Sequence, residues 1–129
     1  MTVTISQAHN EARLGGTKSY LDTGSSNARI RVYNGTRPAS GGTPTTMLVE
    51  IALDKPCGTV AAGVLTLSSS DLPLIANSGT ATWARIVNGN GDYAFDCDVS
   101  ATGGAGEVQL PSTTLFAGGK TQLVSGVLG

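Results

Sequence analysis

Residues 22–27 read DTGSSN, the string that surrounds each catalytic aspartate of pepsin-like aspartic proteases. In that chemistry two carboxylates share one proton, so a chain with a single copy has to form a homodimer. The catalytic loop also follows a hydrophobic strand, whereas LGGTKSY stands before this one, and the closing LVSGVLG is a poor substitute for the apolar segment that supports such a loop. Asp, Gly, Ser and Asn are ordinary turn residues. We therefore interpret DTGSSN as a hinge and predict no catalytic role for Asp22.

Three aspartates, Asp92, Asp96 and Asp98, fall at even spacing in the segment DYAFDCDV. On a β-strand this spacing places all three on one face, and clustered carboxylates can bind calcium. Calcium loops usually take their ligands from a tight turn, however, and Ala94 interrupts the series on the same face. The alternative is a solvated face, or one that pairs with a basic residue of a neighbouring strand. We favour this alternative and predict no metal site.

His9 is the only histidine, so a Ser-His-Asp or Cys-His site would have to be built around it. It lies in a weakly helical N-terminal segment, where a polar helix face is the simpler interpretation. Cys57 and Cys97 are the only cysteines, and they form no C-x-x-C or metal-ligand spacing. Because Met1–Gln7 is not a basic-then-apolar export signal, we predict two free, packed thiols rather than a disulfide. The sequence thus predicts no catalytic residue and no cofactor.

Four aromatic side chains could form a platform on which a sugar stacks: Trp83, Tyr93, Phe95 and Phe116. Tyr93 and Phe95 share one face of the strand pattern with Cys97, which indicates a place in the core. Trp83 is the member whose place the pattern leaves open. Replacement of Trp83 is therefore the sequence-based test for glycan binding.

The chain has 129 residues, which suffices for one domain with a real core. Its 8 basic and 9 acidic side chains give a net charge of -1, so no footprint for nucleic acid or for an anionic membrane is present. Only 13% of the residues are charged, against about 25% in an average soluble protein. This low charge density predicts a surface partly covered by proteins or sugars. No apolar run approaches the ~20 residues of a membrane-spanning helix, and we expect the protein to be made and kept in a cytoplasm.

The N-terminal segment is the one part of the chain with a helical pattern. QAHNEAR follows Ser6, a good N-cap, and carries a weak apolar stripe of Ala8, Ala12 and Leu14. Gly15 and Gly16 interrupt this stripe, and TKSYL is expected to resume the helix for a turn or two. Gly24 suits the left-handed residue that closes a helix. We predict an arm and hinge over residues 1–27.

From Ala28 onward the apolar period is two, which is the period of a β-strand. Strands are predicted at Ala28–Tyr33, at Met47–Leu53 and over Gly58–Leu67, the last either bent at Gly63 or divided into two. The clearest signal is a hairpin from Thr80 to Val99 around the turn NGNG, and VQL, TTLF and TQLVSGVL add three short strands. Eight or so strands at this spacing predict a mainly β domain over residues 28–129, of the antiparallel β-sandwich or jelly-roll-like kind, after the helical arm.

Three blocks stand in a fixed order: RIRVYNGTRPASGG, GTATWARIVNGNGDYAFDCDVSATGGAGEVQLPSTTLFAGG and LVSGVL. In this order they resemble a family of small proteins encoded in bacteriophage and prophage genomes. In that family a helix precedes an (L/I)RI(Y) strand and G-x-x-P, a later G-T-A-x-(W/H)-x-R-I strand turns through a Gly/Asn loop, and a T-G-G-x-G turn follows. The likeness spans residues 6–128, although members often have a continuous charged helix where this chain has LGGTKSY. It implies a structural part of a phage particle, with no catalytic residues to carry over.

The resemblance and the low charge together lead us to expect a non-enzymatic bacteriophage virion protein, assembled in the host cytoplasm. Capsid decoration or cementing against the major capsid protein is the first expectation, with tail proteins as second partners, and homo-oligomers would cover further surface. The alternative is a tail- or fibre-associated module that recognises a host surface glycan. The expected contact segments are the arm Ser6–Asp22 and the loop Asn34–Thr45, because both lie outside the sheet.

Overall fold

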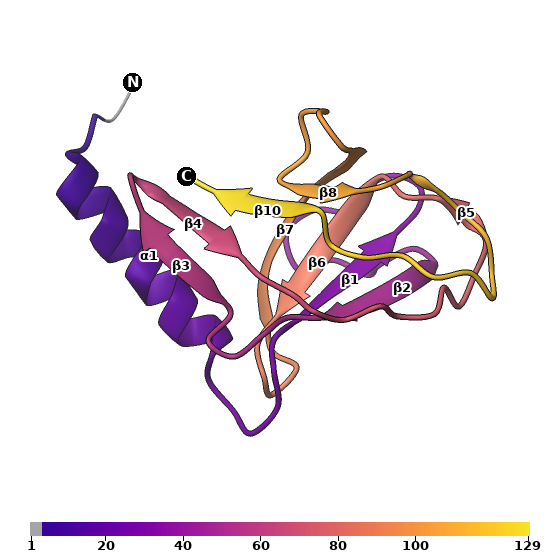
Figure 1. The fold of residues 1–129 in the computed structure, drawn as a ribbon, viewed down its shortest axis with the longest axis horizontal. Helices are drawn as coiled ribbons and strands as arrows, with labels where there is room; N and C mark the ends of the chain where they lie inside the picture. The colour runs from indigo at the N-terminus through magenta and orange to yellow at the C-terminus, as the bar shows by residue number, and fades with distance from the viewer. Residues whose placement is uncertain (1–3) are drawn as a thin grey trace.

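The computed structural model describes residues 4–129, which form one N-terminal helix followed by ten strands (Figure 1). The first three residues of the expected arm lie outside the described residues. The mainly β class and the N-terminal helix are therefore confirmed. The elements are α1 (Gln7–Leu21), β1 (Arg29–Tyr33), β2 (Met47–Ala52), β3 (Gly58–Ala61), β4 (Val64–Leu67), β5 (Gly79–Thr80), β6 (Trp83–Val87), β7 (Tyr93–Ala101), β8 (Val108–Leu110), β9 (Thr114–Leu115) and β10 (Ser125–Leu128).

Eight strands are hydrogen-bonded side by side in the order β2-β1-β6-β7-β8-β10-β4-β3, and β5 pairs separately with β9. Neighbouring strands are antiparallel except β7 and β8, which run parallel with Val99 opposite Val108. The Gly-rich connection after Ala101 makes this possible, because it first returns the chain to the level of Val99. Strand β8 then runs in the same direction as β7. The expectation of a wholly antiparallel sheet is wrong at this pair. A division into the two sheets of a sandwich or jelly roll is not confirmed, because the eight strands form one curled sheet.

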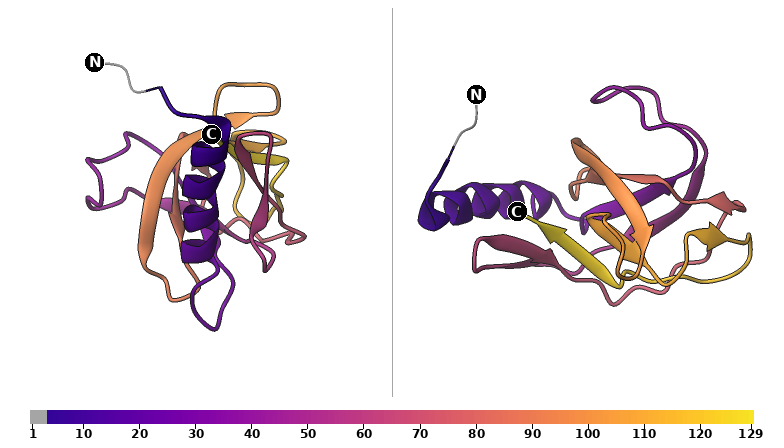
Figure 2. Two further views of the ribbon diagram at one scale, coloured as in Figure 1. Left: turned by 90° about the vertical axis from the view of Figure 1, so that its left-hand side faces the viewer. Right: turned by 90° about the horizontal axis from the view of Figure 1, so that it is seen from above.

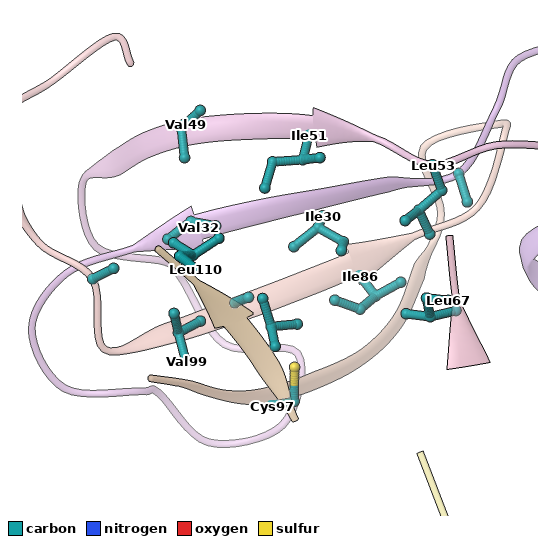
Figure 3. Packing of buried hydrophobic residues seen from close by; sticks show 14 of the residues in the cluster. Ile30, Val32, Val49, Ile51, Leu53, Leu67, Ile86, Cys97, Val99 and Leu110 are labelled. Carbon is teal, nitrogen blue, oxygen red and sulfur yellow. The ribbon is translucent and has the colours of Figure 1, made fainter. Parts of the chain in front are cut away.

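The hydrophobic core lies inside the curl of the sheet (Figure 3). Ile30 of β1 and Ile86 of β6 are fully buried there and meet side chains from the other half of the sheet, among them Leu67 of β4 and Leu110 of β8. The alternation predicted for Ala28–Tyr33 is confirmed, since Ala28, Ile30 and Val32 are all buried. Burial of apolar surface of this kind is the main favourable term in folding.

Helix α1 runs without a break from Gln7 to Leu21, so the predicted interruption at Gly15 and Gly16 is wrong. Both glycines lie on the open side of the helix, where an added Cβ would meet nothing within 4 Å. The opposite side carries Leu14 and Leu21, which are buried, whereas Ala8 and Ala12 of the predicted stripe are exposed. Ser6 caps the helix as predicted, because its Oγ accepts the His9 N–H at 3.1 Å.

The helix packs against the β3–β4 hairpin of its own chain (Figure 2). The hairpin consists of two short strands, which was one of the two predicted alternatives, and its turn residues Ala62 and Gly63 have left-handed φ values of 52° and 78°. Asn10 Nδ2 donates to the Gly63 carbonyl at 2.9 Å, so the turn is tied to the helix. A helix this short is marginal by itself, and the hairpin supplies the surface that holds it.

Candidate functional site

The segment DTGSSN lies where α1 ends and β1 begins, so it follows a helix and not a strand. The Asp22 N–H donates to the Lys18 carbonyl at 3.0 Å and ends the helix. The carboxylate of Asp22 accepts the Cys57 N–H at 2.9 Å. The motif thus joins the arm to the start of β3, and the Asp22 carboxylate has a structural use.

The hinge is packed backbone against backbone on the turn NGNG of the β6–β7 hairpin. Gly24 has a φ of 108°, and a Cβ placed on it would come within 2.7 Å of Asn90 Oδ1 and 2.8 Å of the Asn90 nitrogen. From the opposite side, a Cβ on Gly89 would overlap the carbonyl oxygen of Ser26. Lys55 Nζ donates to the Gly24 carbonyl at 2.5 Å and reinforces this contact. Two glycine turns far apart in the sequence therefore fix the angle between the arm and the sheet.

Trp83 is 1% exposed, so it is not the sugar platform considered from the sequence. Its ring stacks on Tyr33, with centroids 4.5 Å apart and an interplanar angle of 18°. Its Nε1 donates to the Asn34 carbonyl at 3.1 Å and to Thr45 Oγ1 at 3.2 Å. These two bonds tie down both ends of the loop between β1 and β2, and Figure 2 shows the course of this loop away from the sheet. Trp83 is the anchor of that loop.

Arg85 is the centre of the outer face of β6 and β7. Its Nε donates to Asp96 Oδ1 at 2.8 Å and one terminal nitrogen donates to Asp96 Oδ2 at 3.2 Å, a two-pronged pair whose side chains are 11% and 6% exposed. The hydrogen bond to Asp96 raises the pKa of Arg85 above its ordinary value. The guanidinium also lies over the rings of Trp83 and Tyr93, at 5.5 and 4.9 Å from their centroids. The same nitrogen that reaches Asp96 donates to the Gly42 carbonyl at 2.9 Å, which fixes the middle of the loop.

The three evenly spaced aspartates do not form one cluster. Asp96 is paired with Arg85, and Asp98 accepts a hydrogen bond from Arg37 at 2.9 Å. Asp92 lies before β7, in a turn where its N–H donates to Asn88 Oδ1 at 2.9 Å. Among residues 4–129 no group of three potential metal ligands occurs. Asp96 therefore has the basic partner on a neighbouring strand that the alternative interpretation required, whereas the partner of Asp98 lies in the loop between β1 and β2. The expectation of a single three-membered face is wrong for Asp92.

Tyr93 does not share the core face with Cys97, contrary to the sequence pattern. The register shifts between Ile86 and Val87, so that Ile86 lies opposite Phe95 whereas Val87 lies opposite Tyr93. This bulge leaves Ala94 without a partner and turns Tyr93 to the outer face, where it is 36% exposed. Nothing in the sequence marks the bulge, so the alternation alone could not predict it.

Beside Tyr93 the loop and the strand enclose a cleft of about 360 Å³ that we call the polar cleft. The Tyr93 hydroxyl is 3.1 Å from Ser40 Oγ, which closes one wall. The sequence pattern placed Tyr93 and Phe95 in the core, and it assigned the loop Asn34–Thr45 to contacts with other virion proteins and not to a ligand site. The cleft is lined by Arg37, Pro38, Ser40, Tyr93, Phe95 and Asp96.

Phe116 lines a different part of the molecule, at the end that carries β5 and β9, away from α1 (Figure 1). It is 68% exposed, and Leu72 and Leu74 are 57% and 63% exposed. Two hollows, of about 170 and 220 Å³, share Pro111, Lys120 and Thr121; Phe116 lines the first and Leu72 lines the second. We call Leu72, Leu74 and Phe116 the apolar end.

The remaining sequence candidates are not brought together in one site. His9 is exposed in the first turn of α1. Cys57 and Cys97 are buried and free, as predicted. Burial, which disfavours the thiolate, raises the pKa of Cys57 to about 11 and that of Cys97 to about 12. Both cysteines therefore have the properties of packed thiols and not of nucleophiles.

Comparison of the chain with protein-family models, with curated proteins and with solved structures found no match. In the described part of the chain no helix has the length and apolar character needed to cross a membrane.

Proposed function

We propose that this chain is a non-catalytic structural protein of a bacteriophage particle that decorates or cements the capsid through protein–protein contacts. Its resemblance to small phage-encoded proteins supports the proposed place in a phage particle. The exposed apolar side chains support the proposed protein–protein contacts. We further propose to class the curled sheet as sandwich-like, because its two halves cover one core.

The apolar end is the observation that carries this proposal. Leu72, Leu74 and Phe116 are each more than half exposed in a chain with few charges. Large apolar side chains that stay exposed at one end of a molecule usually mark a surface that binds another protein. Burial of one such side chain contributes about 1.5–3 kcal/mol. Three of them give modest affinity per copy, which suits a component present in many copies on one particle.

The arm and the loop support this role less directly than the sequence suggested. Leu14 and Leu21 of the arm are already buried against the same chain, so they do not offer apolar surface to a partner. The loop Asn34–Thr45 is anchored on Trp83. We therefore assign the partner contact to the apolar end. The major capsid protein is the first partner, tail proteins are the second, and further copies of this chain complete the covered surface.

The experiment is to quantify the protein in purified particles of the phage or prophage that encodes it. Decoration predicts a copy number comparable to that of the major capsid protein on a denaturing gel, and a tail location predicts a few to a few dozen copies. Particles that lack the protein are then mixed with purified Phe116→Ser or with Val127→Ser, a control whose side chain is 38% exposed on β10. Phe116→Ser should fail to sediment with the particles while Val127→Ser sediments like the unmodified chain. Absence from particles, or equal sedimentation of both variants, contradicts the proposal.

A further inference from the structure

The polar cleft combines three features that belong together in a ligand site. It is bordered by apolar rings, it is bordered by hydroxyls, and its charged groups are already paired with partners of opposite sign. Its volume of about 360 Å³ is large enough for a small molecule, within the ~300–1,000 Å³ range of known ligand sites.

The charges of the cleft balance. Arg37 on the rim is paired with Asp98, and Asp96 in the wall is paired with Arg85. An anionic ligand would have to compete with Asp98 for Arg37, and a cationic ligand would have to compete with Arg85 for Asp96. The cleft therefore favours a ligand without net charge.

Hydrogen-bonding capacity remains at the rim in spite of these pairs. Arg37 has five N–H donors, of which Asp98 takes one, and its side chain is 39% exposed. The second carboxylate oxygen of Asp98 is free to accept, since that side chain is 60% exposed. The hydroxyls of Ser40 and Tyr93 bond to each other, and each keeps a lone pair for a further donor. Donors and acceptors thus alternate over a short distance, which suits hydroxyl groups because each of them can donate and accept.

The rings supply the other half of such a ligand's chemistry. Pro38, Tyr93 and Phe95 line the cleft. A pyranose ring has one face of C–H groups, which packs on apolar and aromatic surface, and a rim of hydroxyls. We propose that the polar cleft binds a neutral saccharide unit, with Pro38 and Tyr93 against the C–H face and with Arg37, Ser40 and Asp98 on the hydroxyls.

The site is held in shape before a ligand arrives. The loop that carries Arg37 and Ser40 is fixed at both ends by Trp83 and in the middle by Arg85. Tyr93 is held in turn by the guanidinium of Arg85, and its carbonyl accepts the hydroxyl of Tyr20 at 3.1 Å. A site that needs little ordering on binding loses less affinity to conformational entropy.

The test is an NMR titration of the full ¹⁵N-labelled chain with maltotriose, cellotriose, chitotriose and mannotriose, and with sialyllactose as the anionic arm. We expect at least one neutral trisaccharide to shift the amide signals of residues 37–42 and 93–98, with a Kd of about 1 mM or tighter. Arg37→Ala and Tyr93→Ala should each weaken binding about tenfold or more. Arg37 is at the surface, so its variant keeps the test valid if Tyr93→Ala fails to fold. Phe116→Ala at the apolar end is the matched control and should bind like the unmodified chain.

Three outcomes overturn the saccharide site. The first is that no neutral trisaccharide shifts these signals at about 10 mM, tenfold above the expected Kd. The second is that sialyllactose alone binds. The third is that Arg37→Ala binds as tightly as the unmodified chain. The polar cleft and the apolar end share no residue, so failure here leaves the capsid proposal standing, and the reverse also holds.

Discussion

Replacement of Gly24 by alanine is expected to destabilise the fold, because two independent costs fall on one added methyl group. A φ of 108° is a conformation that L side chains rarely adopt, and holding alanine there costs roughly 1–2 kcal/mol. The new Cβ would lie 2.7–2.8 Å from atoms of Asn90 and from the Gly89 carbonyl carbon, and overpacking of this kind costs about 1–3 kcal/mol. The sum is about 2–5 kcal/mol, a large share of the ~5–15 kcal/mol that a domain has in total.

The measurement is urea unfolding followed by circular dichroism and by the fluorescence of Trp83, the only tryptophan. Gly15→Ala is the matched control, because this glycine lies inside α1 with open space at its Cβ position. Alanine there should stabilise the protein by about 0.5–1 kcal/mol through higher helix propensity. If Gly24→Ala stays within about 0.5 kcal/mol of the unmodified chain while the control behaves as expected, the packing of the hinge on the turn NGNG is refuted.

Two further predictions concern the hinge and the buried thiols. Asp22→Asn keeps an oxygen that can accept the Cys57 N–H and should change stability little, whereas Asp22→Ala strands that N–H and should cost about 1–3 kcal/mol in urea unfolding; equal losses would contradict the assigned bond. Cys57 and Cys97 should react with a thiol reagent at about pH 8 only after denaturation, because burial holds both pKa values above the ordinary 9.0. The thiols of the unfolded chain lose their protons first as the pH rises. The thiols should therefore not affect the free energy of unfolding below pH 9.0. Above pH 9.0 this free energy should fall, until the pH passes the folded-state pKa values of about 11 for Cys57 and about 12 for Cys97. Cys97→Ala should flatten that fall, and an unchanged slope would show that the burial of Cys97 is not its cause.

Local patterns predicted the elements well where one period dominated. The alternation over Ala28–Tyr33 gave the core face of β1, and the alternation around NGNG gave the β6–β7 hairpin. Ser6 was recognised as a helix cap because its bond to His9 spans only three residues. The predicted interruption of the helix at Gly15 and Gly16 was wrong for a physical reason. The stability of the helix comes from Leu14 and Leu21, which pack on a hairpin distant in the sequence, and not from its own helix propensity.

The candidate site was predicted only in part, because no local signal places its members together. Tyr93 and Phe95 were considered for sugar contact, but one bulge residue decides which face Tyr93 takes. The pattern left the place of Trp83 open, and its burial depends on a loop that folds back to cover it. Arg37 joins the site through an ion pair with a residue 61 positions away.

The sequence by itself determined the β class, the helix start, most strand positions and the hinge role of DTGSSN. These features follow from periodicity and turn stereochemistry, which act over a few residues. The tertiary structure decided the curl of the sheet, the parallel pairing of β7 with β8, the meeting of Gly24 with Gly89 and the polar cleft. Each of these depends on contacts between segments that lie far apart in the chain, and such contacts form only when the whole core closes.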